Sequence, residues 1–329
     1  MYKTLLQAVK EANDICIIQA ENPDGDSLGS ALALEELLGN LHKKISLYCP
    51  VDIPKYLRYV AGWDRVSDAF NYDADIYIVV DTASMTLLEK ALTPENIAQF
   101  NKKPTFVIDH HTTESDLTFN NVLLSENAVA TSELIYDLAI EAKWHITPMA
   151  AEQMLVAILS DSLGLISEAV SARTLEIVTD LVRCGGKISD IETRRREYMK
   201  KSAAILTYKG QLLQRIQYEL NGRLAIVHVP WEEIEEHSDA YNPGALVIDE
   251  MRLVEDVKLA VVIKTYPDGK LTGKLRANPE AKIAETVASY FGGGGHPYAA
   301  GFRVYETYDK IYHELIEATQ KALEVYEAI

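Results

Sequence analysis

The sequence predicts an α/β protein in which a doubly wound parallel sheet is followed by a smaller mixed α/β domain. Apolar strand-like runs alternate with helical patterns in the first half of the chain, which is typical of a parallel sheet covered by helices. The 329 residues exceed what one hydrophobic core usually spans, which favours two domains. The composition also changes near residue 185, where a glycine pair ends one helical pattern and a charged helical stretch follows.

The elements of the first half follow from its hydrophobic pattern. Short apolar runs bounded by turn residues predict strands, and apolar residues at helical spacing predict helices. The predicted strands cover residues 15–20, 45–49, 76–80 and 105–108, and the predicted helices cover residues 27–38, 130–142 and 149–160.

The second half predicts a linker and a small domain that contains a hairpin. We expect the first domain at residues 1–185, a linker helix at 186–207 and the second domain at 208–329. A charged helical pattern at 191–208 includes Arg194, Arg195 and Arg196, which we interpret as a solvated face. The turn at 267–269 joins two of the predicted strands. Those strands cover 258–266 and 270–276, a further strand covers 223–229, and helices are expected at about 281–291 and 308–328.

The composition limits the kind of protein this can be. With 32 basic and 49 acidic residues the net charge is −17, which argues against a protein that coats long nucleic acids. No apolar run approaches the roughly 18 residues of a membrane helix, and no signal peptide is expected. Three widely spaced cysteines, Cys16, Cys49 and Cys184, favour free thiols in a reducing cytoplasm.

Carboxylates stand where several of the predicted apolar elements end. In an open parallel sheet, ligands bind beyond the carboxyl ends of the strands, so we expect these side chains to share one crevice. Each has an alternative interpretation, because Asp is common in turns and Asp26 or Ser27 could simply cap a helix. The residues are Asp24 and Asp26 after the first strand, Asp81 after the third, Asp109, His110 and His111 after the fourth, and Asp161 after the helix at 149–160.

This mixture of residue types favours a divalent metal centre. Carboxylates that lie close together repel one another unless a cation sits between them. Hard oxygen ligands with one or two imidazoles suit Mn²⁺ or Mg²⁺. Two such ions can clamp a phosphate and activate a water, which predicts phosphoester hydrolysis.

The order of these motifs resembles that of the DHH/DHHA1 phosphoesterase superfamily. The motifs that carry the resemblance are Asn22-Pro23-Asp24-Gly25-Asp26-Ser27, Asp81-Thr82-Ala83-Ser84, Asp109-His110-His111, Asp161-Ser162 with Gly164, and Gly292-Gly293-Gly294-Gly295-His296 with Ala299-Ala300-Gly301. The resemblance covers nearly the whole chain and is closest to the stand-alone nano-RNases that also act as 3′-phosphoadenosine-5′-phosphate phosphatases. It implies an active site in the cleft between a DHH domain and a DHHA1 domain.

The resemblance also implies a role for each residue of the first domain. Asp24 and Asp81 would hold one metal ion. Asp26, Asp81, His110 and Asp161 would hold a second ion, with Asp81 bridging the two. His111 would contact the phosphate, and Asp109 would orient its neighbours.

The resemblance further implies that the second domain would bind the phosphate of the substrate. Gly293, Gly294 and Gly295 would let backbone N–H groups approach a phosphate, and His296 and Arg276 would contact it. Of the aromatic residues Tyr290, Phe291 and Tyr298, which could stack a base, we expect at least two to be core residues.

Two departures from the family pattern weaken the expected first metal site. Relatives usually carry a histidine three residues before Pro23, where this chain has Ala20, and an arginine after the second motif, which residues 85–89 lack. We therefore expect two Mn²⁺ or Mg²⁺ ions, the first bound weakly.

The expected function is hydrolysis of short oligonucleotides or small nucleotides, including 3′-phosphoadenosine-5′-phosphate, to mononucleotides. The alternatives are a polyphosphatase or pyrophosphatase of the same superfamily, and a degenerate member that binds a nucleotide without turnover. The expected partners are a small nucleotide substrate, with no track for long nucleic acid and no membrane. Whether the chain forms a homodimer stays open.

Overall fold

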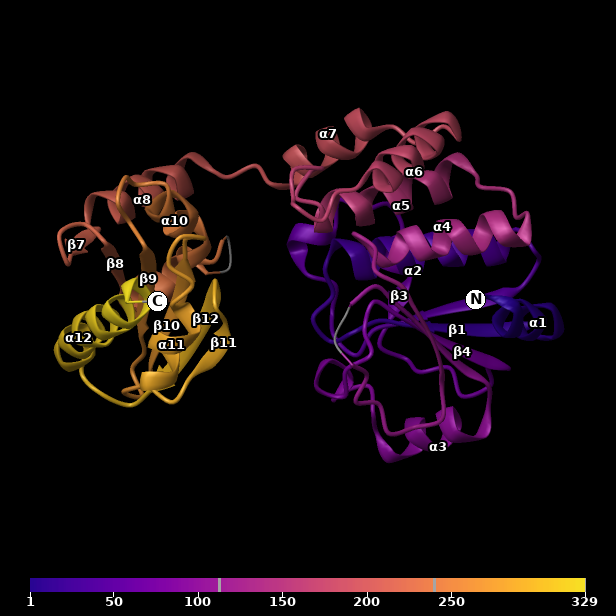
Figure 1. The fold of residues 1–329 in the computed structure, drawn as a ribbon, viewed down its shortest axis with the longest axis horizontal. Coiled ribbons are helices and arrows are strands. Elements are labelled where there is room, and N and C mark those ends of the chain that lie inside the picture. Colours follow the sequence, from indigo (N-terminus) through magenta and orange to yellow (C-terminus); the bar gives the residue numbers. More distant parts are fainter. Residues whose placement is uncertain (112–113, 239–240, 329) are drawn as a thin grey trace. The chain divides into compact units, whose positions relative to one another are not determined.

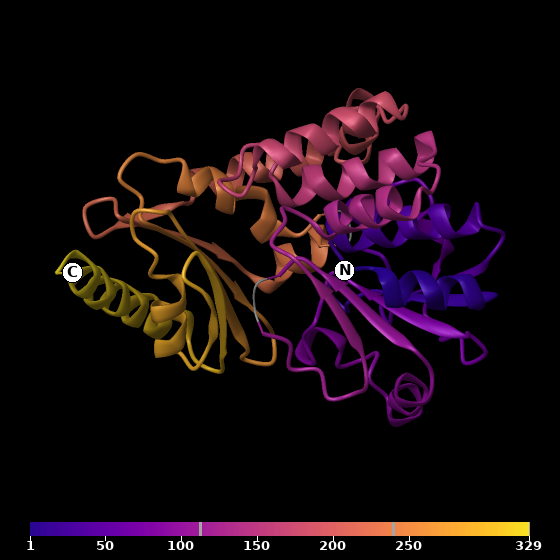
Figure 2. The ribbon, with the colours of Figure 1, turned by 45° about the vertical axis from the view of Figure 1, so that its right-hand side comes forward.

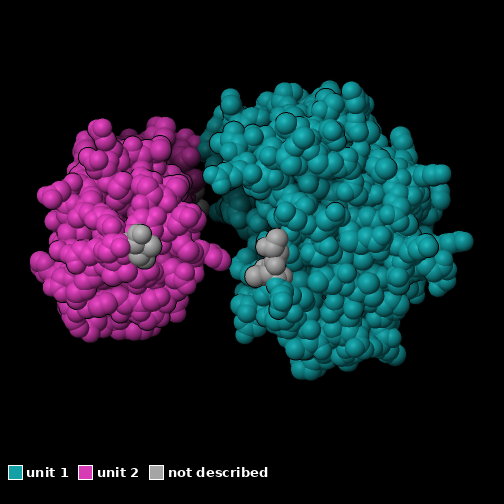
Figure 3. Space-filling view, viewed as in Figure 1, with its two compact units in different colours: residues 1–200 teal, residues 201–329 magenta. Residues whose placement is uncertain are grey.

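The computed structural model describes residues 1–111, 114–238 and 241–328. The chain forms two compact units, residues 1–200 and residues 201–329 (Figure 3). The domain and linker boundaries expected from the sequence stay predictions.

The first unit is built on a sheet whose strands all run parallel. In the described residues the sheet has six strands in the order β3-β2-β1-β4-β5-β6, so the order reverses direction between β1 and β4. Helices lie on both faces, with α2, α4 and α5 on one and α3 on the other (Figure 1). The elements are α1 Lys3–Glu11, β1 Asp14–Ile18, α2 Gly25–Gly39, β2 Lys44–Tyr48, η1 Lys55–Leu57, η2 Trp63–Arg65, β3 Val66–Ser67, β4 Ile76–Val80, η3 Thr86–Leu88, α3 Pro94–Lys102, β5 Thr105–Asp109, β6 Val122–Ser125, α4 Thr131–Ala142, α5 Pro148–Asp161, α6 Ala172–Arg183 and α7 Ile188–Tyr198.

Alternate residues of the central strands enter two different cores. Ile15 and Ile17 of β1 pack with the buried side of α2 and α5, whereas Cys16 and Ile18 pack with Phe100 of α3. Burial on both faces explains why these strands read as continuous apolar runs. The predicted doubly wound parallel sheet is therefore confirmed.

Two glycines bring α2 unusually close to α5. A Cβ atom at Gly25 would lie 2.4 Å from the Ser160 hydroxyl oxygen, and one at Gly29 would lie 2.6 Å from the Gln153 carbonyl oxygen. Larger side chains at these positions would push the helices apart. The close contact brings Asp26, next to Gly25, near Asp161 at the end of α5.

The charged stretch at 191–208 is divided between two helices. Helix α7 ends at Tyr198, and α8 begins at Ala203 after the N-cap Ser202, whose side chain accepts from the Ile205 N–H. The arginines of α7 are paired with acidic side chains. Arg194 pairs with Glu152, and Arg195 and Arg196 both pair with Glu192.

The second unit is a mixed sheet with helices on both faces (Figure 2). Its strand order is β11-β12-β10-β9-β8-β7, with β8 and β9 parallel and the other described pairs antiparallel. Helices α11 and α12 pack on one face, and α8, α9 and α10 pack on the other. The elements are α8 Ala203–Gln214, β7 Gln217–Glu219, β8 Leu224–Val229, α9 Trp231–His237, α10 Pro243–Arg252, β9 Leu259–Thr265, β10 Leu271–Ala277, α11 Ala284–Tyr290, β11 Gly294–His296, β12 Ala299–Val304 and α12 Tyr308–Glu327.

The cysteines are unpaired, as their wide spacing predicted. All three cysteines are free, with Cys16 and Cys49 buried and Cys184 partly exposed. None of the helices in the described ranges is both long and apolar enough to span a membrane.

Candidate metal centre

The predicted acidic residues follow three neighbouring strands at the point where the sheet reverses its order. Asp24 and Asp26 follow β1, Asp81 follows β4, and Asp109 ends β5. Crevices of this kind, beyond the carboxyl ends of parallel strands, are where doubly wound sheets bind ligands. Asp161 reaches the same edge because α5 ends there, next to the first turn of α2.

His110 presents an unpaired ring nitrogen to this crevice. Its Nδ1 atom lies 3.0 Å from the Ala128 carbonyl oxygen, which can only accept a hydrogen bond, so Nδ1 carries the proton. The Nε2 atom therefore has a free lone pair. It is buried and has no hydrogen-bond partner among residues 1–111, 114–238 and 241–328.

Three carboxylates surround that lone pair. The Nε2 atom lies 3.6 Å from Asp26 Oδ2, 3.5 Å from Asp81 Oδ1 and 3.5 Å from Asp161 Oδ2. Without a proton or a cation between them, these four electron-rich groups repel one another. A divalent ion would satisfy the lone pair and the carboxylates together, and oxygen with imidazole donors suits Mn²⁺ and Mg²⁺. These residues therefore fit a metal ion.

Donor atoms form two groups that could each hold an ion. Asp26, His110 and Asp161 form one, and Asp81, His110 and His111 form the other, with the donor atoms in each group within 4.8 Å of one another. The structure thus brings together five of the residues predicted to form the site. It does not include Asp24 in either group of described residues.

The start of α4 holds Asp26 in place. Asp26 is fully buried and accepts hydrogen bonds from the Thr131 N–H at 2.6 Å, the Ser132 N–H at 3.4 Å and the Ser30 hydroxyl at 2.8 Å. A carboxylate at a helix N-terminus is stabilised by the free N–H groups and the helix dipole. The Thr131 hydroxyl also donates to Asp81 at 3.1 Å. The sequence predicts the helix but does not reveal this role of Thr131 and Ser132.

Asp81 is held in an unusual backbone conformation. Its φ of 64° lies in the left-handed region, which costs energy for a residue other than glycine, and its N–H donates to the Ile108 carbonyl at 2.9 Å. Burial, followed by the charges of Asp26 and Asp24, holds its pKa well above the ordinary value. Strain and repulsion gathered on one residue are typical of a ligand-binding site.

Asp161 shows the same crowding of negative charge. Burial, followed by the charges of Asp26 and Asp24, raises its pKa from 3.8 to about 8. The metal-free centre therefore resists full ionisation at neutral pH, and a bound cation would remove that penalty.

Asp109 and His111 form a hydrogen-bonded pair beside the cluster. The His111 Nδ1 atom donates to Asp109 Oδ1 at 2.7 Å, and this bond raises the pKa of the His111 imidazole. Asp109 is buried, whereas 47% of the His111 side chain is exposed, so the imidazole can meet a ligand from solvent.

Asp24 and Ala20 lie at the first turn of α2. Asp24 is exposed, and its carboxylate accepts from the Ser27 N–H at 2.9 Å as the N-cap of that helix. Its charge still raises the pKa values of Asp81 and Asp161, which shows that it is near them. Ala20 is buried and offers no donor atom on its side chain.

In the second unit, the glycine-rich segment forms an edge strand. Gly294 and His296 belong to β11, which pairs with β12. A Cβ atom at Gly293 would lie 2.2 Å from the Gly301 carbonyl oxygen, and Gly295 has a φ of 146° with the Ala299 carbonyl oxygen 2.5 Å from its would-be Cβ. Close approach to β12 therefore requires glycine at both positions, whatever they bind.

Arg276 and His296 lie on the same face of the second sheet. Arg276 of β10 and His296 of β11 are both paired with Ala299 of β12, and directly paired residues of antiparallel strands point to one face. The expectation of two core residues among the three aromatics is wrong. Phe291 is buried against Phe302, but Tyr290, the last residue of α11, and Tyr298, between β11 and β12, are 53% and 41% exposed.

The fold and the cluster define a two-unit α/β protein with a carboxylate–histidine centre suited to divalent ions. Comparison with known families agrees with that description. The DHH family, N-terminal domain, matches residues 14–158, and the DHHA1 domain matches residues 232–328. Because these two domains together account for most of the chain, it belongs to the DHH/DHHA1 phosphoesterase superfamily.

Individual relatives are similar over nearly their whole length. The chain is 24% identical to the probable bifunctional oligoribonuclease and PAP phosphatase NrnA of Streptococcus mutans serotype c, covering 95% of this chain and 97% of that protein. It is 22% identical to the bifunctional oligoribonuclease and PAP phosphatase NrnA of Bacillus subtilis, covering 93% and 94%. The solved structure of an exopolyphosphatase-related protein from Bacteroides fragilis matches with a TM-score of 0.82 and 20% identity, covering 99% and 96%, which shows a shared fold.

Proposed function

We propose that this chain is a metal-dependent phosphoesterase that hydrolyses short oligonucleotides or small nucleotides to mononucleotides, with 3′-phosphoadenosine-5′-phosphate as a further substrate. The unpaired Nε2 atom of His110, enclosed by three carboxylates at 3.5–3.6 Å, carries the proposal. The relatives named as oligoribonucleases and PAP phosphatases support the choice of substrate. Three free cysteines are consistent with a cytoplasmic location.

Divalent ions, Mn²⁺ or Mg²⁺, would supply electrostatic stabilisation of the phosphoryl group and activation of a water. Asp26, Asp81, His110 and Asp161 would hold them. Asp24 is the remaining proposed ligand, and Ala20 leaves its site one donor short.

The pair of Asp109 and His111 would assist the leaving group. With Nδ1 bonded to Asp109, a protonated His111 directs an N–H at Nε2 toward a ligand. The raised pKa of His111 favours the protonated form of the imidazole. His111 would thus bind a phosphate oxygen and donate a proton to the departing oxygen, while Asp109 stabilises the imidazolium.

The second unit would supply the phosphate contacts. Arg276 offers a planar guanidinium and His296 an exposed imidazole on one face of the sheet. The amides of Gly293, Gly294 and Gly295 are proposed to assist. The net charge of −17 offers no track for a long phosphate backbone, so short substrates are favoured.

Product analysis tests this function. The protein is stripped with chelator, returned to Mn²⁺, and incubated with a 5′-phosphorylated dinucleotide, 3′-phosphoadenosine-5′-phosphate, pyrophosphate and a long single strand. We expect mononucleotide from the first two, faster than from the long strand, and no product under chelation. Asp26→Asn should lower the rate at least about 100-fold, because a metal contributes several kcal/mol to the transition state. Asp73→Asn, which removes an exposed carboxylate of the same unit, should not.

Other results would select an alternative. Cleavage of pyrophosphate alone would make the chain a pyrophosphatase. Nucleotide binding by folded, Mn²⁺-loaded protein without product from any substrate would make it a degenerate binding protein.

A further inference from the structure

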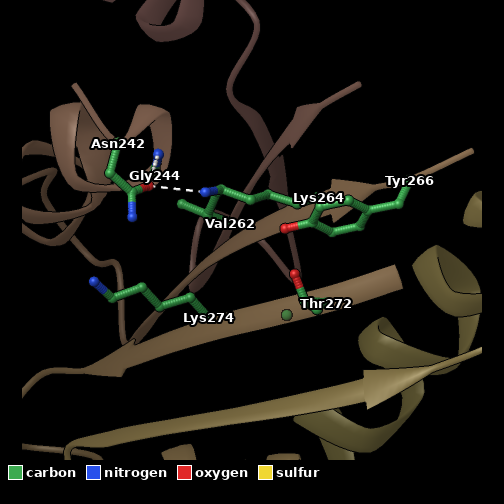
Figure 4. Close-up of a pocket in the computed structure, with 8 residues that line it drawn as sticks. Asn242, Gly244, Val262, Lys264, Tyr266, Thr272 and Lys274 are labelled. Atoms are coloured by element: carbon green, nitrogen blue, oxygen red, sulfur yellow. Dashed lines mark hydrogen bonds between the residues drawn. The ribbon is translucent and has the colours of Figure 1, made fainter. Parts of the chain in front are cut away.

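The second unit contains a cavity of about 160 Å³ on the sheet face that α10 covers. Asn242 and Gly244 line it from the start of α10, Lys264 and Tyr266 from β9 and its end, and Thr272 and Lys274 from β10 (Figure 4). One water needs roughly 10–15 Å³ of such space, so the cavity has room for a ligand larger than water.

The strand register gathers positive charge along this face. Thr272 is paired with Lys264, and two residues further along β10 lies Lys274, on the same side as Arg276. Figure 4 shows both lysine side chains extending toward Asn242. Lys270 lies beside them, 4.1 Å from the ring centre of Tyr266, but its ammonium is paired with Asp268 at 3.9 Å.

Among the described residues, no carboxylate is paired with Lys264 or Lys274, the two lysines that line the cavity. The Lys264 ammonium donates to the Asn242 side-chain oxygen at 2.8 Å, a neutral partner. Within the described residues Lys274 makes no hydrogen bond and no ion pair. Burial lowers the pKa of both lysines, and the nearby charges of Lys274 and Arg276 add to the effect. Asp249, whose charge opposes this effect at Lys274, is itself paired with Arg252 at 3.7 Å.

An unneutralised lysine is informative in this chain. Acidic residues outnumber basic ones by 49 to 32, so a partly desolvated ammonium group that is not paired with a carboxylate is available for an external anion. The hydroxyls of Thr272 and Tyr266 offer further donors to an anion's oxygens (Figure 4). The first amides of α10 contribute little, because those of Gly244 and Ala245 already donate to Asn242.

We propose that this cavity is a second phosphoryl-binding site, formed by Lys264 and Lys274 and separate from Arg276 and His296. Lys274 lies two residues from Arg276, about 7 Å along the strand, so one ligand with two phosphates can engage both positions. The anion is either a phosphate of the substrate that is not cleaved, which rests on the proposed function, or a free phosphate ion.

Calorimetric titration of the full chain with inorganic phosphate, in the presence of chelator, tests the site itself. We expect a bound phosphate whose affinity falls about 10- to 100-fold in Lys274→Met, the loss expected for one charged hydrogen bond. Lys274→Arg should keep most of the affinity. Lys310→Met, which removes an exposed lysine of the same unit that is paired with Glu306, should keep all of it. Equal affinity in wild type and Lys274→Met, or an equal loss in Lys310→Met, would overturn the proposal.

Two kinetic measurements distinguish the sources of the phosphate. If it belongs to the substrate, Lys274→Met should lower the ratio of kcat/KM for 3′-phosphoadenosine-5′-phosphate to that for bis(p-nitrophenyl) phosphate about tenfold. If it is a free ion, inorganic phosphate should change the rate at which the wild-type protein hydrolyses bis(p-nitrophenyl) phosphate. It should not change the rate of Lys274→Met with that substrate.

Should no substrate be turned over while Lys274-dependent phosphate binding persists, the proposed function fails and this site stands. If melting curves show Lys274→Met unfolded, Thr272→Val, which removes one hydroxyl donor, gives the same test with a smaller expected loss.

Discussion

Replacing Asp161 by asparagine should stabilise the metal-free protein at pH 8 and weaken its stabilisation by Mn²⁺. The carboxyl pKa is about 8 in the folded chain and near 3.8 when exposed. An acid whose pKa is raised by folding binds its proton more tightly when folded. Its cost to stability is therefore absent below about pH 4, grows as the pH rises, and is complete above about pH 8.

The size of this effect has an upper limit set by the shift. The pKa of Asp161 is higher by about four in the folded chain, and a change of one in a pKa corresponds to about 1.36 kcal/mol. The whole difference therefore corresponds to about 6 kcal/mol. Because 24% of the Asp161 side chain is exposed, solvent screens part of the repulsion, and we expect about 1–3 kcal/mol. The new amide can also donate to His110 Nε2, which lies 3.5 Å from the present Asp161 Oδ2.

Differential scanning calorimetry in chelator, from pH 5 to pH 8, measures this. For a unit of 200 residues, about 1–3 kcal/mol raises Tm by about 2–12 °C. The difference in Tm between Asp161→Asn and wild type should become smaller as the pH is lowered toward 5. The difference in Tm between Asp73→Asn and wild type should not change with pH in this way. Added Mn²⁺ should raise the wild-type Tm more than that of Asp161→Asn. A variant no more stable than wild type at pH 8, or equally stabilised by Mn²⁺, would refute the reasoning.

Four further substitutions test individual roles. Asp81→Ala should cause the largest loss of both bound metal and rate among single ligand changes, since the family resemblance implies that Asp81 would hold both ions; a variant that keeps two tight ions would show that Asp81 is only a turn residue. Ala20→His should tighten the weaker of two Mn²⁺ steps in a titration, by about tenfold or more for an added imidazole ligand; two equally tight steps in wild type, unchanged by the substitution, would mean that another residue already supplies the missing ligand. Arg276→Ala and His296→Ala should raise KM or lower kcat with metal affinity unchanged, as for phosphate contacts worth about 1.5–3 kcal/mol each; loss of metal from either would place that residue in a different role.

Long apolar runs made much of the fold predictable from the sequence. Elements with a weak hydrophobic pattern could not be predicted. Strands β1, β4 and β5 are buried on both faces and stand out as apolar runs, and α2 and α5 have clear helical spacing. Strand β3 has two residues, and β6 is an edge strand with only Leu124 buried, so neither has a periodic signal. Helix α3 begins at a capped proline, Pro94, and buries only Asn96 and Phe100.

Site residues whose carboxylates follow a strand could be predicted from the sequence. The backbone groups that hold those side chains in place could not. The order of Asp26, Asp81, His110 and Asp161 along the chain indicated a common crevice. The carbonyl of Ala128, which fixes the His110 tautomer, and the amides of Thr131 and Ser132, which hold Asp26, carry no side-chain signal. The left-handed backbone of Asp81 and the pairing of β11 with β12 depend on tertiary contacts in the same way.

The central claim is that a divalent ion lies between His110 Nε2 and the carboxylates around it. Anomalous diffraction at the manganese edge, from crystals of the full chain soaked in Mn²⁺, tests it most directly. We predict a strong peak within about 2.0–2.4 Å of His110 Nε2 and of oxygens from Asp26 and Asp161, with a weaker second peak beside Asp81. A map with no peak at His110, or with manganese bound only elsewhere, would contradict the account.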